Sequence, residues 1–280
     1  MSARPAARRS SRRPTRARGE ARRALPGLRL SQPRAAALLG MLTAAVLAGQ
    51  LVNASIFGLK RLDLPAPRWT DLAEARARVG VPLGLNVFSI RSAAIEARLE
   101  ALPAVADASV SVALPDALQV RITERRPVIV WSVGGARYLV DSEGAIFAVL
   151  APVDPTELDV PVVLDTRPES TARVHIGGQL DPIDLDAGTR LGALTPADLG
   201  SAATGLAVGV TDANGFTLGA LPDGWVAVFG PYSPVLRSTD LIPGQVRLLR
   251  SMLDGREPTV ARVILADDVR GTYVERSPPP

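Results

Sequence analysis

The stretch that most constrains this chain is Ala35–Leu59, which contains no formally charged residue. Arg34 precedes it, and Lys60 and Arg61 follow it. A helix of this length extends about 37 Å, which exceeds the ~30 Å hydrocarbon core of a bilayer. Helices of soluble proteins normally carry a polar face, and Ala35–Leu47 offers none. The pattern predicts a membrane-spanning helix over residues 35–59; the alternative is a buried helix of a soluble protein.

Charge is distributed unevenly around this stretch. Residues 1–34 hold eleven arginines and one acidic residue, Glu20, whereas the whole chain sums to only +4. Arginines immediately before an apolar span stay in the cytoplasm, so the sequence predicts a single-pass type II protein of the inner or plasma membrane. A cleaved signal peptide is the alternative. Its apolar core would be only about 7–15 residues, and Val52-Asn53-Ala54 is a poor cleavage site.

The N-terminal tail, residues 1–34, has the composition of a disordered segment, rich in Arg, Ser and Pro. It contains no aromatic residue to stack on nucleic-acid bases, so no specific nucleic-acid partner is expected. Its simplest role is to orient the span and to contact anionic lipid headgroups. The chain has no cysteine, so the exported part folds without disulfides.

Residues 60–125 carry the pattern of a small α+β domain. A short strand within Gly58–Leu64 precedes predicted helices over Asp71–Val79 and Ser92–Leu102. Residues 107–114 and 118–123 alternate apolar and polar on either side of a turn, which predicts a β-hairpin with one buried face. The buried face should consist of Ala108, Val110, Val112, Leu114, Leu118, Val120 and Ile122.

Residues 126–276 read as a strand-rich β domain, followed by a short tail, residues 277–280. Its predicted strands are Pro127–Val133, Arg137–Val140, Ala145–Leu150, Pro161–Leu164, Leu206–Val210, Gly215–Leu218, Trp225–Phe229, Val260–Leu265 and Gly271–Glu275. One helix is expected over Pro243–Leu253. Weak helical character covers Thr189–Ala203, and residues 165–188 stay unassigned.

No catalytic, cofactor or metal site follows from the residue types. His175 is the single histidine and lacks a nucleophile motif, so it is expected in a surface loop. Asp181, Asp184 and Asp186 with Gly188 invite a calcium interpretation. Counted from Asp184, however, the glycine and glutamate of an EF-hand loop are missing, and acidic turns are expected instead. A pair of catalytic carboxylates stays open, because a sequence does not report their separation.

Six short motifs stand out between residues 86 and 147. They are Asn86–Ile90, Leu102–Ala108, Leu114-Pro115, Glu124–Pro127 with Trp131, Tyr138–Asp141 and Gly144–Phe147. Together they resemble the FtsQ/DivIB family of cell-division proteins. The resemblance implies a POTRA domain of order strand-helix-helix-strand-strand, followed by a β domain.

The resemblance also implies a function. Proteins of this kind are non-enzymatic scaffolds that bind FtsB-like and FtsL-like single-span proteins at the septum and help to control septal peptidoglycan synthesis, without a cofactor or small-molecule substrate. Two other classes stay open. One is a membrane-anchored cell-wall hydrolase with a carboxylate pair, and the other is a POTRA-containing transport or assembly component.

The last predicted strand is the candidate binding site. Its residues are Gly271, Thr272, Tyr273, Val274 and Glu275, and the preceding helix offers Arg247 and Arg250 on its polar face. An exposed sheet edge is a liability unless it is used or blunted. The resemblance implies that a division partner adds a strand here, and the alternative is a plain hairpin end protected by Pro278-Pro279-Pro280.

Overall fold

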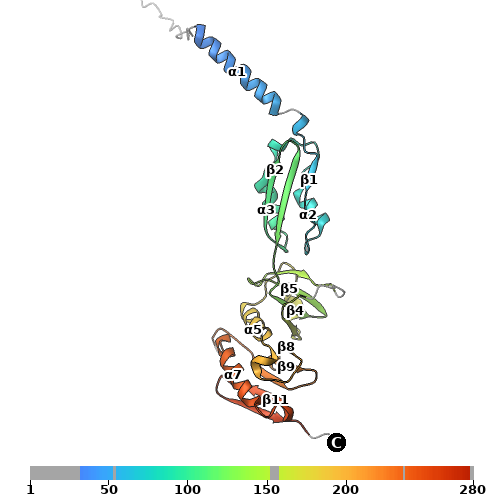
Figure 1. The fold of residues 1–280 in the computed structure, drawn as a ribbon, viewed down its shortest axis with the longest axis vertical. Coiled ribbons are helices and arrows are strands. Elements are labelled where there is room, and N and C mark those ends of the chain that lie inside the picture. The colour runs from blue at the N-terminus through green and yellow to red at the C-terminus, as the bar shows by residue number, and fades with distance from the viewer. Residues whose placement is uncertain (1–31, 53–54, 152–157, 236, 278–280) are drawn as a thin grey trace, which may run out of the picture. The chain divides into compact units, whose positions relative to one another are not determined.

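The computed structural model describes residues 32–52, 55–151, 158–235 and 237–277 (Figure 1). The chain divides into two units, residues 1–53 and 54–280, which we describe one at a time. In the first unit, helix α1 covers Gln32–Val52 and leaves Leu39, Met41 and Leu42 exposed. Within the described residues, we find no helix with both the length and the hydrophobicity that crossing a membrane requires.

The prediction of one helix over residues 35–59 is wrong at its C-terminal end. Helix α1 ends at Val52, and the 3-10 helix η1 forms at Ser55–Phe57. Leu59 is buried, with 1% of its surface exposed, and belongs to the core of the following domain. A run of apolar residues does not reveal which of its members are needed by the next domain.

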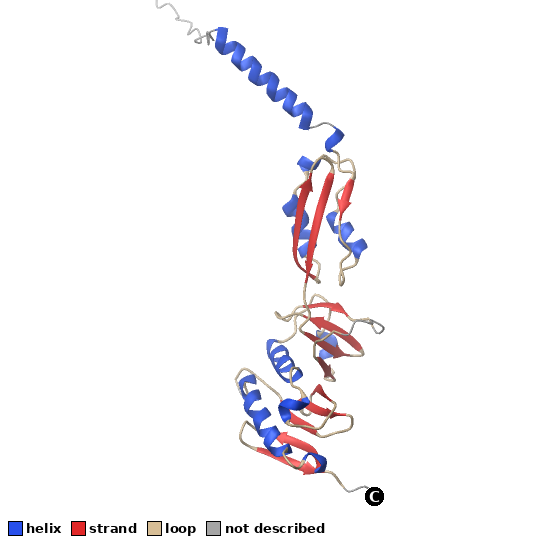
Figure 2. Ribbon diagram, in the orientation of Figure 1, coloured by secondary structure: helices blue, strands red, loops and turns tan. Residues whose placement is uncertain are grey.

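The second unit begins with a three-stranded sheet of order β1-β3-β2, in which β1 runs parallel to β3 (Figure 2). The elements are β1 Arg61–Asp63, α2 Leu72–Val79, η2 Val87–Ser89, α3 Ser92–Glu100, β2 Val105–Ala113 and β3 Ala117–Glu124. Both helices share one core with the hairpin through Val79, Leu99 and Val120. This is the predicted strand-helix-helix-strand-strand order.

Local sequence signals fix the limits of helix α2. The Asp71 side chain accepts a hydrogen bond from the Glu74 amide at 2.8 Å, which satisfies a free donor of the first turn. Gly80 ends the helix with φ 58°, a left-handed conformation that glycine adopts without strain. The hairpin prediction fails at one position. Leu114 is exposed because it lies in the turn, beyond the end of β2.

The rest of the unit is a mixed sheet of nine strands, ordered β12-β11-β10-β9-β8-β7-β4-β5-β6. The strands are β4 Ile129–Val133, β5 Ala136–Val140, β6 Ile146–Val149, β7 Val162–Asp165, β8 Gly205–Thr211, β9 Gly215–Leu221, β10 Val226–Gly230, β11 Val260–Leu265 and β12 Gly271–Glu275. The expected strands are all present, with small shifts of their ends.

Helices pack on one face of this sheet. They are α5 Pro182–Gly192, α6 Pro196–Leu199 and α7 Ile242–Leu253. The short elements α4 Ser170–Arg173, η3 Thr239–Leu241 and η4 Glu257–Thr259 come before α5, before α7 and after α7. Leu191 of α5, Leu199 of α6 and Leu249 of α7 share a core with Trp131 and Val263 of the sheet. Alternate residues of the strands therefore form the buried face of the sheet. The predicted bounds of α7 were correct to within one residue.

The prediction of acidic turns around Asp184 is wrong, because α5 covers this region. Asp181 is the N-cap of that helix and accepts from the Ile183 amide at 2.8 Å. Gly188 lies within the helix, where an added Cβ would come 3.0 Å from both Ile129 and Trp131. The glycine that looked like a turn signal instead lets the helix pack closely on the sheet.

Candidate partner-binding edge

Strand β12 is one edge of the nine-stranded sheet and pairs antiparallel with β11. The Ala266 amide donates to the Arg270 carbonyl at 2.9 Å, and the Arg276 amide donates to the Thr259 carbonyl at 2.8 Å. Antiparallel strands alternate between bonded and non-bonded pairs, so even-numbered residues of β12 face β11. The backbone groups of Gly271, Tyr273 and Glu275 point away from the sheet.

The side chains beside this edge differ between the two sheet faces. An added Cβ on Gly271 would lie 2.9 Å from Met252 Sδ and 3.4 Å from a Leu248 methyl, so this face meets α7. Tyr273 lies on the same face by alternation, and Arg256 approaches its ring at 5.8 Å. On the opposite face Val274 is 54% exposed. The edge thus offers apolar surface on both sides.

The two arginines predicted to support the edge lie on α7, but Arg250 does not face β12. Arg247 and Arg250 are both exposed on α7, as the helical pattern predicted. The Nε of Arg250 lies 3.9 Å from the position of a Cβ on Gly200, at the end of α6. Since Leu248 and Met252 are the residues that meet Gly271, Arg250 lies on the far side of the helix from β12.

Arg256 was missed as a neighbour of the edge. It follows Gly255, which has φ 65° and reverses the chain after α7. The direction in which the chain leaves a helix depends on that turn, so helical periodicity carried no signal for Arg256.

The opposite end of the sheet, strand β6, is covered at Ile146 and Phe147, whereas Val149 is 42% exposed. The Ile146 amide donates to the Gly178 carbonyl at 3.0 Å, and the Gly177 amide donates back to the Ile146 carbonyl at 2.8 Å. Phe147 is buried in a second cluster with Val130 and Leu139, against which Trp69 packs. The two edge strands of this sheet therefore differ in how far neighbouring residues cover them.

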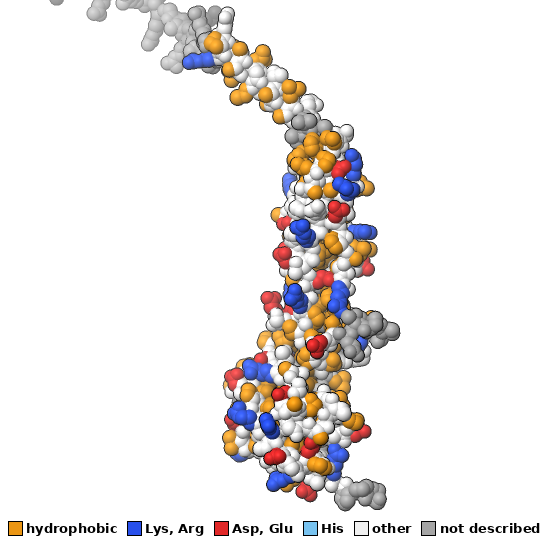
Figure 3. All heavy atoms as spheres, in the orientation of Figure 1, with side chains coloured by type: hydrophobic (Ala, Val, Ile, Leu, Met, Phe, Trp, Pro, Cys, Tyr) orange, Lys and Arg blue, Asp and Glu red, His pale blue; other side chains and the backbone are white. Residues whose placement is uncertain are grey.

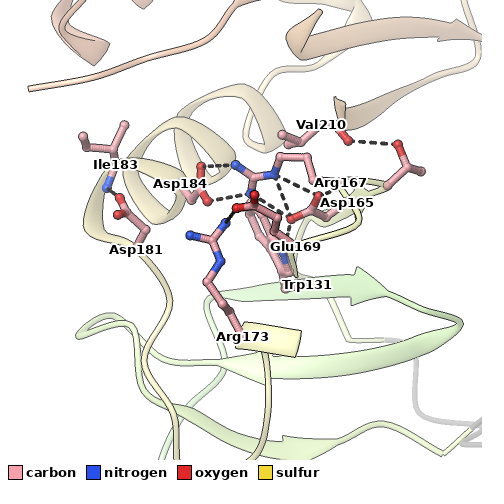
Figure 4. A network of polar contacts seen from close by, with 10 residues as sticks. Trp131, Asp165, Arg167, Glu169, Arg173, Asp181, Ile183, Asp184 and Val210 are labelled. Carbon is pink, nitrogen blue, oxygen red and sulfur yellow. Dashed lines mark hydrogen bonds and ion pairs between the residues drawn. The ribbon is translucent and has the colours of Figure 1, made fainter. Parts of the chain in front are cut away.

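A carboxylate pair, the feature that a hydrolase would require, occurs beside α5 (Figure 4). Asp165 at the end of β7 and Asp184 both contact Arg167 Nη2, at 2.8 and 2.6 Å. The Trp131 indole also donates to Asp165 at 3.1 Å. Asp165, Arg167 and Asp184 line a cavity of about 190 Å³ together with Ser170, which is buried.

The surroundings push the two carboxyl groups in opposite directions. Burial raises the pKa of Asp184 above its ordinary value, although the Arg167 guanidinium opposes the change. Burial acts in the same sense on Asp165, but hydrogen bonds from Arg167 and Ser170 outweigh it and lower its pKa. Because Arg167 bonds both carboxylates, the three groups form an ion network that connects β7 with α5. This arrangement is typical of a structural role more than of a catalytic acid and base.

His175 is exposed, and its Nδ1 lies 3.0 Å from the Arg173 carbonyl oxygen. It sits in the loop before Gly177, as predicted. In the part of the chain that the structure describes, we find no cluster of three or more His, Cys, Asp or Glu residues arranged for a metal ion.

Known proteins resemble this chain in its sequence. The family described as "POTRA domain, FtsQ-type" matches residues 68–125. "Cell division protein FtsQ" of Chloroflexus aurantiacus is 27% identical over 208 residues, which is 74% of this chain and 66% of the relative. The chain is thus similar to cell-division proteins of the FtsQ kind, and the family match itself covers the POTRA region.

Two further relatives with the same description show how the similarity is distributed. That of Cereibacter sphaeroides is 35% identical over 114 residues, or 41% of this chain and 36% of the relative. That of Streptomyces griseus is 37% identical over 103 residues, which is 36% of this chain and 48% of the relative. The matches thus span about two thirds, one third and one half of the relatives' own length. The FtsQ-type POTRA match ends at residue 125, far before β12, so the family does not itself locate the binding edge.

Proposed function

We propose that this protein is a non-enzymatic scaffold of the division machinery whose strand β12 accepts a strand from another division protein. The observation that carries the proposal is the outward-facing backbone of Gly271, Tyr273 and Glu275 at an edge that the described residues leave unpaired. The expected partners are single-span proteins of the FtsB and FtsL kinds, and the assembly acts at the septum on peptidoglycan synthesis.

Strand addition suits this edge physically. Main-chain hydrogen bonds supply affinity, and alternate side chains of the added strand supply selectivity. One set of partner side chains would meet Tyr273, Met252 and Arg256, and the other would meet Val274. An apolar strand would suit both faces, and an acidic side chain in its first set would meet Arg256, which approaches Tyr273.

The proposal also includes attachment to the cell membrane through the uncharged part of helix α1, which begins at Ala35, with the N-terminus cytoplasmic. Its support is the lack of charge in that stretch and the eleven arginines before it. Reporter enzymes fused after Arg29 and after Leu150 should give opposite compartment signals. Identical signals would contradict the topology, and a fluorescent fusion that fails to form a midcell ring would contradict the septal role.

The strand-addition test uses proline at an outward-facing position. Tyr273→Pro removes one N–H that points away from β11, which sheet edges tolerate. We expect loss of partner co-purification with unchanged circular dichroism. Tyr273→Ala is the matched control, since it removes the ring but keeps the N–H, and it should retain most of the binding.

Thr272→Pro probes the inner side of the same strand. It deletes a donor that β11 uses opposite Ile264, so it should weaken the fold as well as the complex. If Tyr273→Pro folds and still retains the partner, the binding edge lies elsewhere.

A further inference from the structure

One end of the POTRA domain gathers exposed apolar side chains from three separate segments. Leu83 is 71% exposed and Leu114 is 61% exposed. The set, which we name the tip patch, is Ile56, Leu83, Leu85, Phe88 and Leu114. All five lie in loops, turns or 3-10 helices, outside the strands and α-helices of the domain.

Backbone hydrogen bonds hold these segments together. The Leu59 amide donates to the Leu85 carbonyl at 2.8 Å, and the Gly84 amide donates to the Leu59 carbonyl at 2.7 Å. The Lys60 amide donates to the Asp116 carbonyl at 2.8 Å, which brings the β2–β3 turn alongside. The patch is therefore a built surface and not a scatter of loop residues.

Aromatic contact and charge complete the surface. The rings of Phe57 and Phe88 meet edge to face with centroids 5.1 Å apart. Lys60 and Arg61 lie at the rim with 62% and 69% of their side chains exposed, and they share one partner, Asp116, at 3.4 and 3.6 Å. Figure 3 shows hydrophobic side chains gathered beside η1 with basic side chains next to them. Apolar residues rimmed by excess positive charge suit the interface of an anionic bilayer.

We propose that the tip patch inserts into the headgroup region of the membrane to which the chain is attached, an inference that rests on the membrane attachment proposed above. Chain connectivity favours lipid as the occupant. Ile56 follows closely after Val52, the end of the apolar helix α1. Leu and Phe side chains enter the acyl boundary, while Lys60 and Arg61 reach lipid phosphates.

The sequence permits a direct measurement, because the chain has no cysteine. Leu83→Cys and Leu114→Cys would each carry a single nitroxide label in the full chain, reconstituted into phosphatidylethanolamine–phosphatidylglycerol vesicles. The controls are Glu100→Cys and Val269→Cys, both at exposed positions. Glu100 lies beyond the opposite end of β2, whose nine residues span about 30 Å.

We expect collisions with lipid-soluble oxygen, relative to a water-soluble nickel complex, to be about threefold more frequent at positions 83 and 114 than at the controls. Phosphatidylcholine vesicles should weaken the difference, because they offer no net negative charge to Lys60 and Arg61. Positions 83 and 114 as water-accessible as the controls would overturn the inference while leaving membrane attachment intact.

Two other outcomes would be informative in the same experiment. Labels that become shielded only when a division partner is added would identify the tip patch as a protein-docking surface and overturn insertion into lipid. A chain that does not float with vesicles at all would contradict the proposed attachment and this inference together.

Discussion

The two edges of the nine-stranded sheet, β6 and β12, have opposite surroundings. At β6, Ile146 exchanges two backbone hydrogen bonds with Gly177 and Gly178, and Phe147 is 2% exposed. At β12, by contrast, Tyr273 is 39% exposed and its backbone faces outward. Exposed edges invite aggregation and are usually blunted. The contrast between an edge that is covered over half its length and one that is open throughout supports the partner-binding role proposed for β12.

The comparison predicts that the half of the sheet near β6 is held more firmly. Arg167→Met would leave Asp165 and Asp184 buried without their cation, which costs about 3–5 kcal/mol in comparable networks. A large loss of thermal stability should follow in calorimetry. Arg190→Met is the control. Arg190 and Asp186 form an exposed ion pair within α5, and such a pair contributes under ~0.5 kcal/mol to the unfolding free energy. Equal effects of the two changes would contradict the role of the network.

Truncating one aromatic residue at each edge tests the comparison directly. Phe147→Ala removes a buried ring and should lower the unfolding free energy by about 3 kcal/mol. Tyr273→Ala removes a ring in contact with solvent, and its cost should stay below ~1 kcal/mol. Chemical denaturation of both variants provides the measurement. A similar cost at both edges would mean that the fold depends on packing at β12 as much as on packing at β6.

The same network should make stability depend on pH. Asp165 has a lowered pKa in the folded state, so its contribution is present above its ordinary value of 3.8 and is lost as pH falls through the folded pKa. Asp184, with a raised pKa, acts in the opposite sense. Asp165→Asn should cost about 1–3 kcal/mol at neutral pH, and the difference from wild type should shrink below pH 3.8. A difference that stays constant with pH would exclude this origin.

His175→Ala should have the smallest effect of this series. The residue is exposed in the loop that leads to Gly177 and the covered edge, so we expect less than ~0.5 kcal/mol in stability. Complementation of a division-deficient strain should be unchanged at normal protein level. A division defect would point back to the enzyme class.

Much of the fold could be predicted because its signals are local. The hairpin around Val110 and Val120 alternates with period two, and the helix ending at Gly80 has a cap at each end. Helix α5 was missed because Pro182 and Gly188 resemble turn residues in sequence. What makes Gly188 compatible with a helix is its contact with Trp131, which lies more than fifty residues away.

The candidate edge was found from the sequence, but its orientation was not. Which amides of β12 face outward depends on the register with β11, including the irregularity between Val260 and Arg262. The position of Arg250 beside Gly200 likewise depends on how α7 lies across the sheet. Periodicity assigns residues to faces of an element and does not say what stands opposite them.

The parallel pairing of β1 with β3 has a mechanical consequence. Tension between the chain before Arg61 and the β domain enters the POTRA domain at the start of β1 and leaves it at the end of β3, Glu124. Because the two strands run in the same direction, such a pull slides one along the other. Their three registered residue pairs are then strained together in shear instead of being peeled apart in turn. The rate of forced unfolding sets how long such a link survives, so the shear arrangement would lengthen the life of this domain under a pull.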